Sequence, residues 1–202
     1  MKKTIHLSPE NYIGKGLHRK CYIHPEDPFK CIKINYNIGA DIETNREVKY
    51  YKHLLKRQIS WECLSKYYGS VDTDLGIGHV YDLIRDDDNS ISISLENYLK
   101  QSLNAHELNE LTTALINLKK ALVNDRIITM TIKSKNILYQ RRNCGNRLVI
   151  IDNIGNSKLI KIDNYCNFLA KKSINRKWQR FIKDIERENF ALVAAYLAKN
   201  RK

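Results

Sequence analysis

Hydrophobic periodicity changes once along this chain, at the charged segment RDDDNS that covers residues 85–90. Before this segment, short strand-like runs alternate with turns, as in KCYIH, PEDP and KCIKI. Two such runs joined by a turn predict a hairpin, and YYGSVDT and GHVYDLI predict two further strands. Residues 42–57 instead carry apolar side chains at helical spacing. The first part of the chain is therefore predicted to be an antiparallel sheet with one helix.

After the charged segment the pattern becomes helical. Leucines recur at steps of three and four residues between 107 and 124 and form one apolar stripe. Asn104 followed by Glu107 resembles a capping box at the start of this helix. ILYQ and LVIID flank the turn RRNCGNR and predict a second hairpin. Further helices are predicted near the C-terminus, where one face carries Trp178, Phe181, Ile182 and Ile185. This order predicts the α+β class.

The charge balance is strongly basic, with 35 Lys and Arg against 22 Asp and Glu and a formal net charge of +13. Such a balance favours anionic partners, which include phosphates, nucleotides, nucleic acid and membrane surfaces. An evenly basic, solvated surface explains the same charge equally well. The length of 202 residues fits one domain, or two small lobes that share an interface.

The five cysteines argue against a zinc site and against a disulfide framework, because none forms a C-x-x-C pair and their number is odd. A reducing cytosol fits this usage, so we expect a cytoplasmic protein. The basic start MKKTIHLSPENY has no apolar core and is not expected to be a secretory signal. The apolar run FALVAAYLA is too short to span a bilayer, and no membrane span is expected.

Two glycines and a strand lysine form the first candidate site. Gly14 and Gly16 lie between two predicted strands and do not open a helix, which argues against a dinucleotide-binding fingerprint. Glycines in a hairpin turn let backbone N–H groups approach a phosphate, although most such turns are only turns. Lys33 lies on the face opposite its apolar neighbours, so it faces either solvent or the side of the glycines. In the second case Glu47, on the following helix, could hold it by an ion pair.

An amide and a carboxylate form the second candidate site. Asn136 precedes one strand of the second hairpin, and Asp152 follows the other. Because paired antiparallel strands bring their outer ends together, these side chains are expected to converge. Their oxygens suit a hard cation such as Mg²⁺. Either residue alone would more often cap a loop.

Taken in order, these pieces resemble the parts of a protein kinase. The strings GKGLHRKCYIHPED, KCIKI, NREVKYY, VYDLI, NDRIITM, KSKNIL and DNIG resemble more closely a small bacterial family of compact kinase-like proteins, PhoP regulatory network protein YrbL. The resemblance covers about residues 7–190. It implies one domain over 1–202 with a bilobal protein-kinase-like fold. A small sheet lobe with one helix would span about 1–84, a hinge about 81–88, and a reduced, mainly helical lobe about 89–202.

The resemblance also implies roles for the residues of the first site. Gly14 and Gly16 would cover the phosphates of ATP, and Lys33 would contact the α- and β-phosphates. Glu47 would brace Lys33. These residue types recur because phosphoryl transfer needs positioning and charge neutralisation more than covalent chemistry.

Two further groups receive roles by the same resemblance. The hinge backbone, from Tyr81 through Leu83 to Arg85, would meet the adenine of the nucleotide. Asn136 and Asp152 would hold Mg²⁺. ATP and Mg²⁺ are therefore the expected cofactors.

The chain departs from the kinase pattern at several positions. The third glycine of the loop is replaced by Arg19, and the catalytic base by Thr131, whose hydroxyl cannot accept a proton at neutral pH. Only 50 residues follow Asp152 (202 − 152), and they contain no Ala-Pro-Glu triplet. The resemblance therefore favours a pseudokinase that binds Mg-ATP. An atypical kinase with an unidentified protein or small-molecule acceptor stays open, and in it Lys133 would stabilise the transferring charge.

A basic nucleic-acid-binding module without a nucleotide site is the competing hypothesis. It is motivated by the net charge of +13 and by runs such as YQRRN and SINRKWQRFIK. The 12 tyrosines and the basic residues are not interleaved as in a known RNA-binding motif, so this hypothesis is not favoured.

Overall fold

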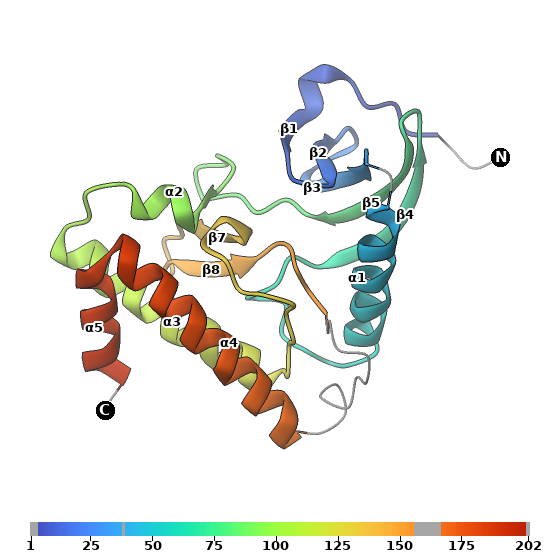
Figure 1. Ribbon diagram of the computed structural model, residues 1–202. Helices are drawn as coiled ribbons and strands as arrows, with labels where there is room; N and C mark the ends of the chain where they lie inside the picture. The colour runs from blue at the N-terminus through green and yellow to red at the C-terminus, as the bar shows by residue number, and fades with distance from the viewer. Residues whose placement is uncertain (1–3, 38, 156–166, 201–202) are drawn as a thin grey trace.

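The structure is a computed structural model and describes residues 4–37, 39–155 and 167–200. Cys166 lies outside these residues. A sheet with one long helix makes up one half of the molecule, and three long helices lie in the other (Figure 1). Within the described ranges, no helix combines the length and the apolar content that crossing a bilayer requires.

Five antiparallel strands form the sheet of the first half, in the order β1-β2-β3-β5-β4. After the short 3-10 helix η1 (Pro9–Asn11), the strands are β1 (Tyr12–Lys15), β2 (Arg19–His24), β3 (Asp27–Asn35), β4 (Tyr67–Thr73) and β5 (Gly76–Asp82). The helix α1 (Ala40–Leu55) connects β3 to β4. The hairpin, the helix and the two later strands predicted from the sequence are confirmed.

The two faces of this sheet are covered differently. One face packs against the N-terminal segment and buries Tyr22, Ile32, Ile34 and Val80 together with Leu7. The other face packs against α1. There the ring of Tyr51 lies with its centroid 5.7 Å from that of Tyr67 and 5.4 Å from that of Tyr81. Because strand residues alternate between faces, Lys33 lies on the α1 side, opposite Ile32 and Ile34.

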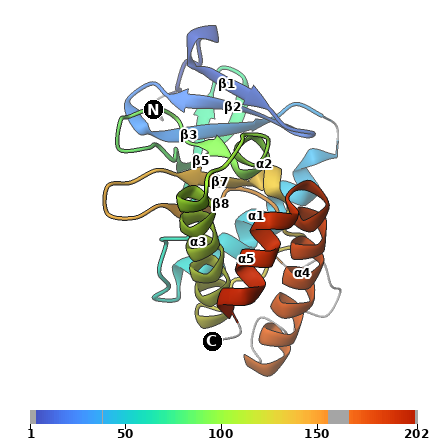
Figure 2. The ribbon, with the colours of Figure 1, turned by 90° about the vertical axis from the view of Figure 1, so that its left-hand side faces the viewer.

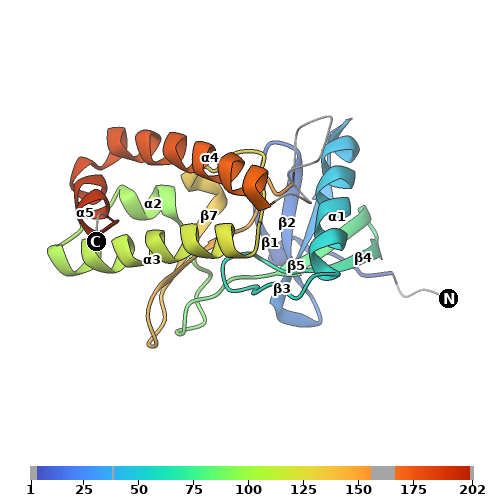
Figure 3. The ribbon, with the colours of Figure 1, turned by 90° about the horizontal axis from the view of Figure 1, so that it is seen from below.

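The second half begins with a strand and a short helix that the sequence did not predict, β6 (Ile93–Ser94) and α2 (Leu95–Leu99). It continues with α3 (Ala105–Asn124), η2 (Ser134–Asn136), β7 (Ile137–Gln140), β8 (Arg147–Ile150), α4 (Asn167–Glu188) and α5 (Phe190–Asn200). Strands β6, β7 and β8 form a small sheet in that order. The three long helices pack on one another (Figure 3), and Figure 2 shows them below the larger sheet.

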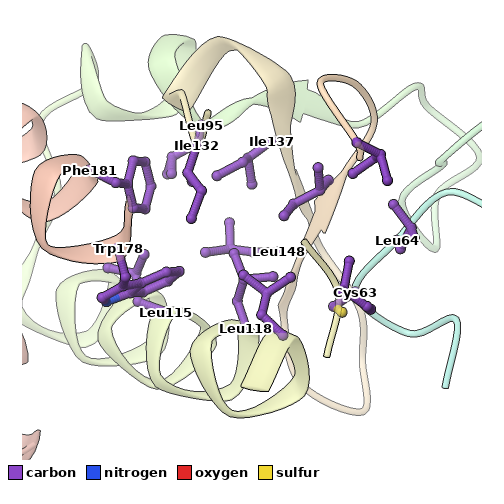
Figure 4. Packing of buried hydrophobic residues seen from close by; sticks show 14 of the residues in the cluster. Cys63, Leu64, Leu95, Leu115, Leu118, Ile132, Ile137, Leu148, Trp178 and Phe181 are labelled. Atoms are coloured by element: carbon purple, nitrogen blue, oxygen red, sulfur yellow. The ribbon is translucent and has the colours of Figure 1, made fainter. Parts of the chain in front are cut away.

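The predicted apolar stripe of α3 forms the centre of the core in this half. Leu115 lies beside Trp178 of α4, and Leu148 of β8 lies close to Leu118 (Figure 4). Leu108 is only partly buried, because it lies near the exposed first turn of the helix. The predicted capping box at this turn is confirmed: the Glu107 N–H donates to Asn104 Oδ1 at 3.0 Å, and the Asn104 N–H donates to Glu107 Oε2 at 2.8 Å.

Backbone contacts and the buried hydroxyl of Tyr50 are among the contacts that join the two halves. Ser65, just before β4, donates its N–H to the carbonyl of Ile150 in β8 at 3.0 Å. Tyr50 of α1 accepts the N–H of Ile128 at 2.8 Å and donates to the carbonyl of Arg126 at 3.2 Å. These contacts fix the segment that leads to Thr131 against α1.

We expect Tyr50→Phe to lower the free energy of unfolding by about 1–3 kcal/mol, because the buried N–H of Ile128 loses its acceptor. Urea unfolding of both proteins measures this difference. Tyr12→Phe is the matched control; Tyr12 is exposed, and its change should stay within about 0.5 kcal/mol. Equal effects of the two changes would show that the Tyr50 hydroxyl does not join the halves.

Candidate functional site

Four residues form a row across the face of the sheet that packs against α1. Gly14 pairs with Cys21, Cys21 with Lys33, and Lys33 with His79. Directly opposed residues of antiparallel strands point to the same face. Lys33 therefore shares a face with Gly14, as one of the two predicted alternatives requires. Its side chain is buried at 7% relative exposure, so the solvent-facing alternative is wrong.

The two loop glycines differ in their surroundings. No atom lies within 4 Å of the position that a Cβ at Gly14 would take, and its φ angle is not in the left-handed region. Neither the backbone nor the packing of the described residues therefore requires glycine at position 14. The Gly16 N–H donates to the carbonyl of Arg19 at 2.8 Å, which closes the turn. This amide of Gly16 is thus already used within the protein.

Lys33 does not form the predicted ion pair with Glu47. Its Nζ donates to the carbonyl of Ile151 at 2.5 Å and lies 4.7 Å from the centroid of the Tyr81 ring. Both side chains do face the same region, because the hydroxyl of Tyr81 donates to Glu47 Oε1 at 3.0 Å. The predicted location is thus confirmed, and the predicted partner is wrong.

Glu47 pairs instead with Arg19, the residue at the position of the missing third glycine. Arg19 Nη1 and Nη2 donate to Glu47 Oε1 and Oε2, each at 3.0 Å. Arg19 Nη2 also donates to Asp152 Oδ1 at 2.5 Å. One guanidinium group thereby connects β2, α1 and the segment after β8. We call the five residues Arg19, Lys33, Glu47, Tyr81 and Asp152 the Arg19 cluster.

Burial makes the charges of the cluster costly unless they are paired. The side chains of Glu47 and Arg19 keep only 3% and 11% of their exposure. Burial raises the pKa of Glu47 above its ordinary value, although the charges of Arg19 and Lys33 oppose this. Burial also acts to raise the pKa of Asp152, but Lys33, Arg19 and the Asn153 N–H outweigh it, and the pKa of Asp152 is lowered. Asp152 is thus ionised at neutral pH.

The guanidinium group of Arg19 retains hydrogen-bonding capacity. A guanidinium has five N–H donors, and three hydrogen bonds to the described residues use three of them, two at Glu47 and one at Asp152. Burial lowers the pKa of Arg19, but the carboxylates of Glu47 and Asp152 outweigh it and raise this pKa well above its ordinary value. Arg19 is therefore permanently charged, and some of its N–H donors make no hydrogen bond to the described residues.

The predicted magnesium ligands are neighbours in the structure. The Ile151 N–H donates to the carbonyl of Asn136 at 3.0 Å, so Asn136 lies beside the residue that precedes Asp152. Asp152 Oδ1 already accepts from Arg19 at 2.5 Å and from the Asn153 N–H at 2.7 Å. A divalent cation on this carboxylate would meet the guanidinium charge within a few ångströms. That repulsion is on the order of several kcal/mol.

With Arg19 in this position, the residues present do not fit Mg²⁺. Within the described ranges, no group of three or more His, Cys, Asp or Glu side chains is arranged to hold a metal ion. Asp152 Oδ1 would become available to the ion only after Arg19 had left it.

Of the two residues predicted for a catalytic loop, Thr131 lies close to the cluster and Lys133 does not touch it in the described part of the chain. Thr131 is exposed, and its Oγ1 accepts from Asn153 Nδ2 at 3.1 Å. Asn153 follows Asp152 directly and has a left-handed φ of 61°. Lys133 is exposed and borders a hollow of about 410 Å³, which is also lined by Glu96 and Arg187. No contact within the described residues joins Lys133 to the Arg19 cluster.

The predicted hinge is partly occupied by the protein itself. Tyr81 lies inside the sheet, paired with Cys31 and with Tyr67, and its side chain belongs to the cluster. The Leu83 N–H donates to the carbonyl of Phe29 at 2.8 Å. An adenine contact through this N–H would need that bond to break, and a contact through other backbone groups of the segment stays a prediction.

Sequence reasoning missed the role of Arg19, which it treated only as a missing glycine. The signal was available. Arg19 lies two residues before Cys21 in a strand, so it points to the same face as Cys21 and Lys33. A basic side chain on that face competes with Lys33 for Glu47.

Two comparisons with known proteins point to the same family. The family model described as PhoP regulatory network protein YrbL matches residues 5–186. A YrbL protein of Escherichia coli (strain K12) is 41% identical over 181 residues, which cover 88% of this chain and 86% of the relative. A YrbL protein of Shigella flexneri matches with the same identity and coverage.

We expect Arg19→Gln to lower the free energy of unfolding by about 3–5 kcal/mol at pH 7, because Glu47 is left buried without its cation. Adding Glu47→Gln should recover part of this loss, since the buried group is then neutral. Urea unfolding of the single and double variants measures both effects. The control is Lys20→Gln on the same strand, which should change stability by less than about 0.5 kcal/mol.

The loss in Arg19→Gln should also depend on pH. Because burial raises the folded-state pKa of Glu47, protonation favours the folded state, and the loss should shrink as the pH falls through that raised pKa. A double variant no more stable than Arg19→Gln, together with a loss independent of pH, would contradict the charge-pairing role of Arg19.

Proposed function

The chain belongs to the PhoP regulatory network protein YrbL family, and from this premise and the Arg19 cluster we propose that it is a kinase-like protein that binds ATP. The phosphates would lie beside Lys33 and Arg19, beneath the hairpin that carries Gly14. Mg²⁺, which the sequence predicts as a second cofactor with Asn136 and Asp152 as its ligands, is left out of this proposal. No step proposed here passes through the ion, because Arg19 holds Asp152.

One observation carries this proposal: Lys33, Glu47 and Asp152 meet in one cluster although they come from three distant segments. Lys33 lies on β3, Glu47 on the helix that follows it, and Asp152 after the second hairpin. In protein kinases the phosphate-binding lysine lies on the third strand, its glutamate on the next helix, and a metal-binding aspartate follows in the other lobe. The shared order and the shared meeting point support a kinase-like origin of the site.

The position of Thr131 supports binding without efficient transfer. Thr131 occupies the base position of the kinase motif in the sequence, and its hydroxyl lies beside Asn153, one residue from Asp152. A neutral hydroxyl cannot accept the proton of an acceptor. The proposed protein therefore holds ATP in place and transfers its phosphoryl group slowly or not at all.

A polyanion-binding face is a second candidate, and α4 is the observation that favours it. This helix exposes six basic side chains, Lys171, Lys172, Arg176, Arg180, Lys183 and Arg187. A helix with such a face attracts phosphate backbones through a salt-dependent charge interaction. Salt-sensitive binding of DNA or RNA, lost when these residues are changed to Gln, would support this function independently of ATP.

We expect ATP to stabilise the protein by about 2.7 kcal/mol at a concentration about a hundred times its dissociation constant. Thermal shift and calorimetry with and without Mg²⁺ measure this effect. Lys33→Met should weaken binding, because it removes the ammonium from the cluster. Lys52→Met, on the exposed side of α1, is the matched control and should leave binding unchanged. No shift with millimolar ATP under either condition would contradict the nucleotide site.

We also expect little phosphorylation of generic protein substrates by the unchanged chain. General-base assistance is typically worth about 10²–10⁴-fold in rate, and Thr131 cannot supply it. Thr131→Asp should leave ATP affinity roughly unchanged, because Thr131 is exposed and has no contact with the cluster other than through Asn153 among the described residues. A radiolabelled-ATP assay tests this beside an Asp152→Ala control. Robust turnover that Asp152→Ala abolishes would show that the chain is an active kinase.

A further inference from the structure

Arg19 holds the place beside Asp152 that a bound cation would take. Its Nη2 lies 2.5 Å from Asp152 Oδ1, and that oxygen also accepts the Asn153 N–H at 2.7 Å. The guanidinium group brings one positive charge between the carboxylates of Glu47 and Asp152. A charge at this point does electrostatically what a metal ion at Asp152 would do.

The contacts of Arg19 with Glu47 keep it in this place. Glu47 is almost fully buried, and both of its oxygens accept from Arg19. If Arg19 moved out to admit an ion, it would leave an unpaired carboxylate in the interior, where charge is costly. Lys33 cannot easily replace it, because Lys33 is held at the carbonyl of Ile151. The resident arginine is therefore favoured over an exchangeable ion.

The remaining groups of the cluster suit phosphate. Two N–H donors of Arg19 are left over (5 − 3), since three hydrogen bonds connect it to Glu47 and Asp152. Lys33, on the same face of the sheet, adds a second cation. Gly14 lies in the same row of the sheet as Lys33 and leaves open space there, because no atom lies within 4 Å of the position that its Cβ would take. Guanidinium and ammonium groups bind phosphate oxygens by charge-assisted hydrogen bonds.

We infer that this site binds the triphosphate of a nucleotide without a divalent cation, with the guanidinium group of Arg19 in place of the metal beside Asp152. This inference rests on the nucleotide binding proposed above and specifies the ionic form of the ligand. Arg19 is then a specificity-determining residue: it lets ATP bind with or without Mg²⁺, whereas the ordinary kinase arrangement requires Mg-ATP.

Calorimetric titration of ATP into the full chain tests this inference, once with EDTA and once with Mg²⁺ in excess over ATP. For the unchanged chain we expect the two dissociation constants to differ by less than about fivefold. The double variant Arg19→Gln with Glu47→Gln removes the resident cation and leaves no unpaired buried charge. We expect it to bind ATP at least about tenfold more weakly in EDTA than with Mg²⁺, because Asp152 is then open to the ion.

The outcomes separate this inference from the proposed function. If the unchanged chain binds at least fivefold more tightly with Mg²⁺, or if the double variant is as indifferent to Mg²⁺ as the unchanged chain, the inference is overturned and nucleotide binding stands. If ATP binds under neither condition, the proposed function itself fails. Lys33→Met in EDTA is the control for the basic surface. It should weaken binding at least about tenfold. Binding of unchanged affinity would lie elsewhere on the protein and would also overturn the inference.

Discussion

The carboxylate of Glu47 sets the strongest constraint on this molecule. It keeps only 3% of its exposure, and a buried charge of this kind is tolerated only when it is paired and hydrogen-bonded. Arg19 supplies the opposite charge with two hydrogen bonds, and the hydroxyl of Tyr81 supplies a third. These partners come from β2 and β5, so satisfying one side chain of α1 fixes the helix against the sheet. Through Asp152 the same guanidinium group also holds the second half.

The choice of Arg19 as partner changes what Lys33 can do. A lysine offers a point charge, whereas arginine matches both carboxylate oxygens at once, so arginine is the better partner for a buried carboxylate. Lys33 does not pair with Glu47 and donates instead to the carbonyl of Ile151. Both cations therefore lie on the side of Asp152, where together they outweigh burial and keep that carboxylate ionised.

Much of the fold was predictable from local patterns, and the pairing in the site was not. The strands other than β6, together with α1, α3 and the capping box of Asn104, follow from periodicity and short-range chemistry, which act within one element. The shared face of Gly14 and Lys33 was predictable as one of two alternatives. The partner of Glu47 depends on which of two basic residues reaches it, and Arg19 lies 28 positions away. Strand register and side-chain length decide which basic residue pairs with Glu47. A comparison of motif positions predicts neither.

The two main departures from the kinase pattern differ physically. Arg19 replaces a glycine and gains three hydrogen bonds to carboxylates, so the change adds an interaction that the glycine could not make. Thr131 stands in place of a carboxylate and accepts a hydrogen bond from Asn153. This bond orders the loop, but the Thr131 hydroxyl accepts no proton. Under the proposed function, the first change places positive charge beside the phosphates. The second removes the carboxylate that would accept the proton of an acceptor. Both changes agree with the proposed function, a site that holds ATP and transfers its phosphoryl group slowly or not at all.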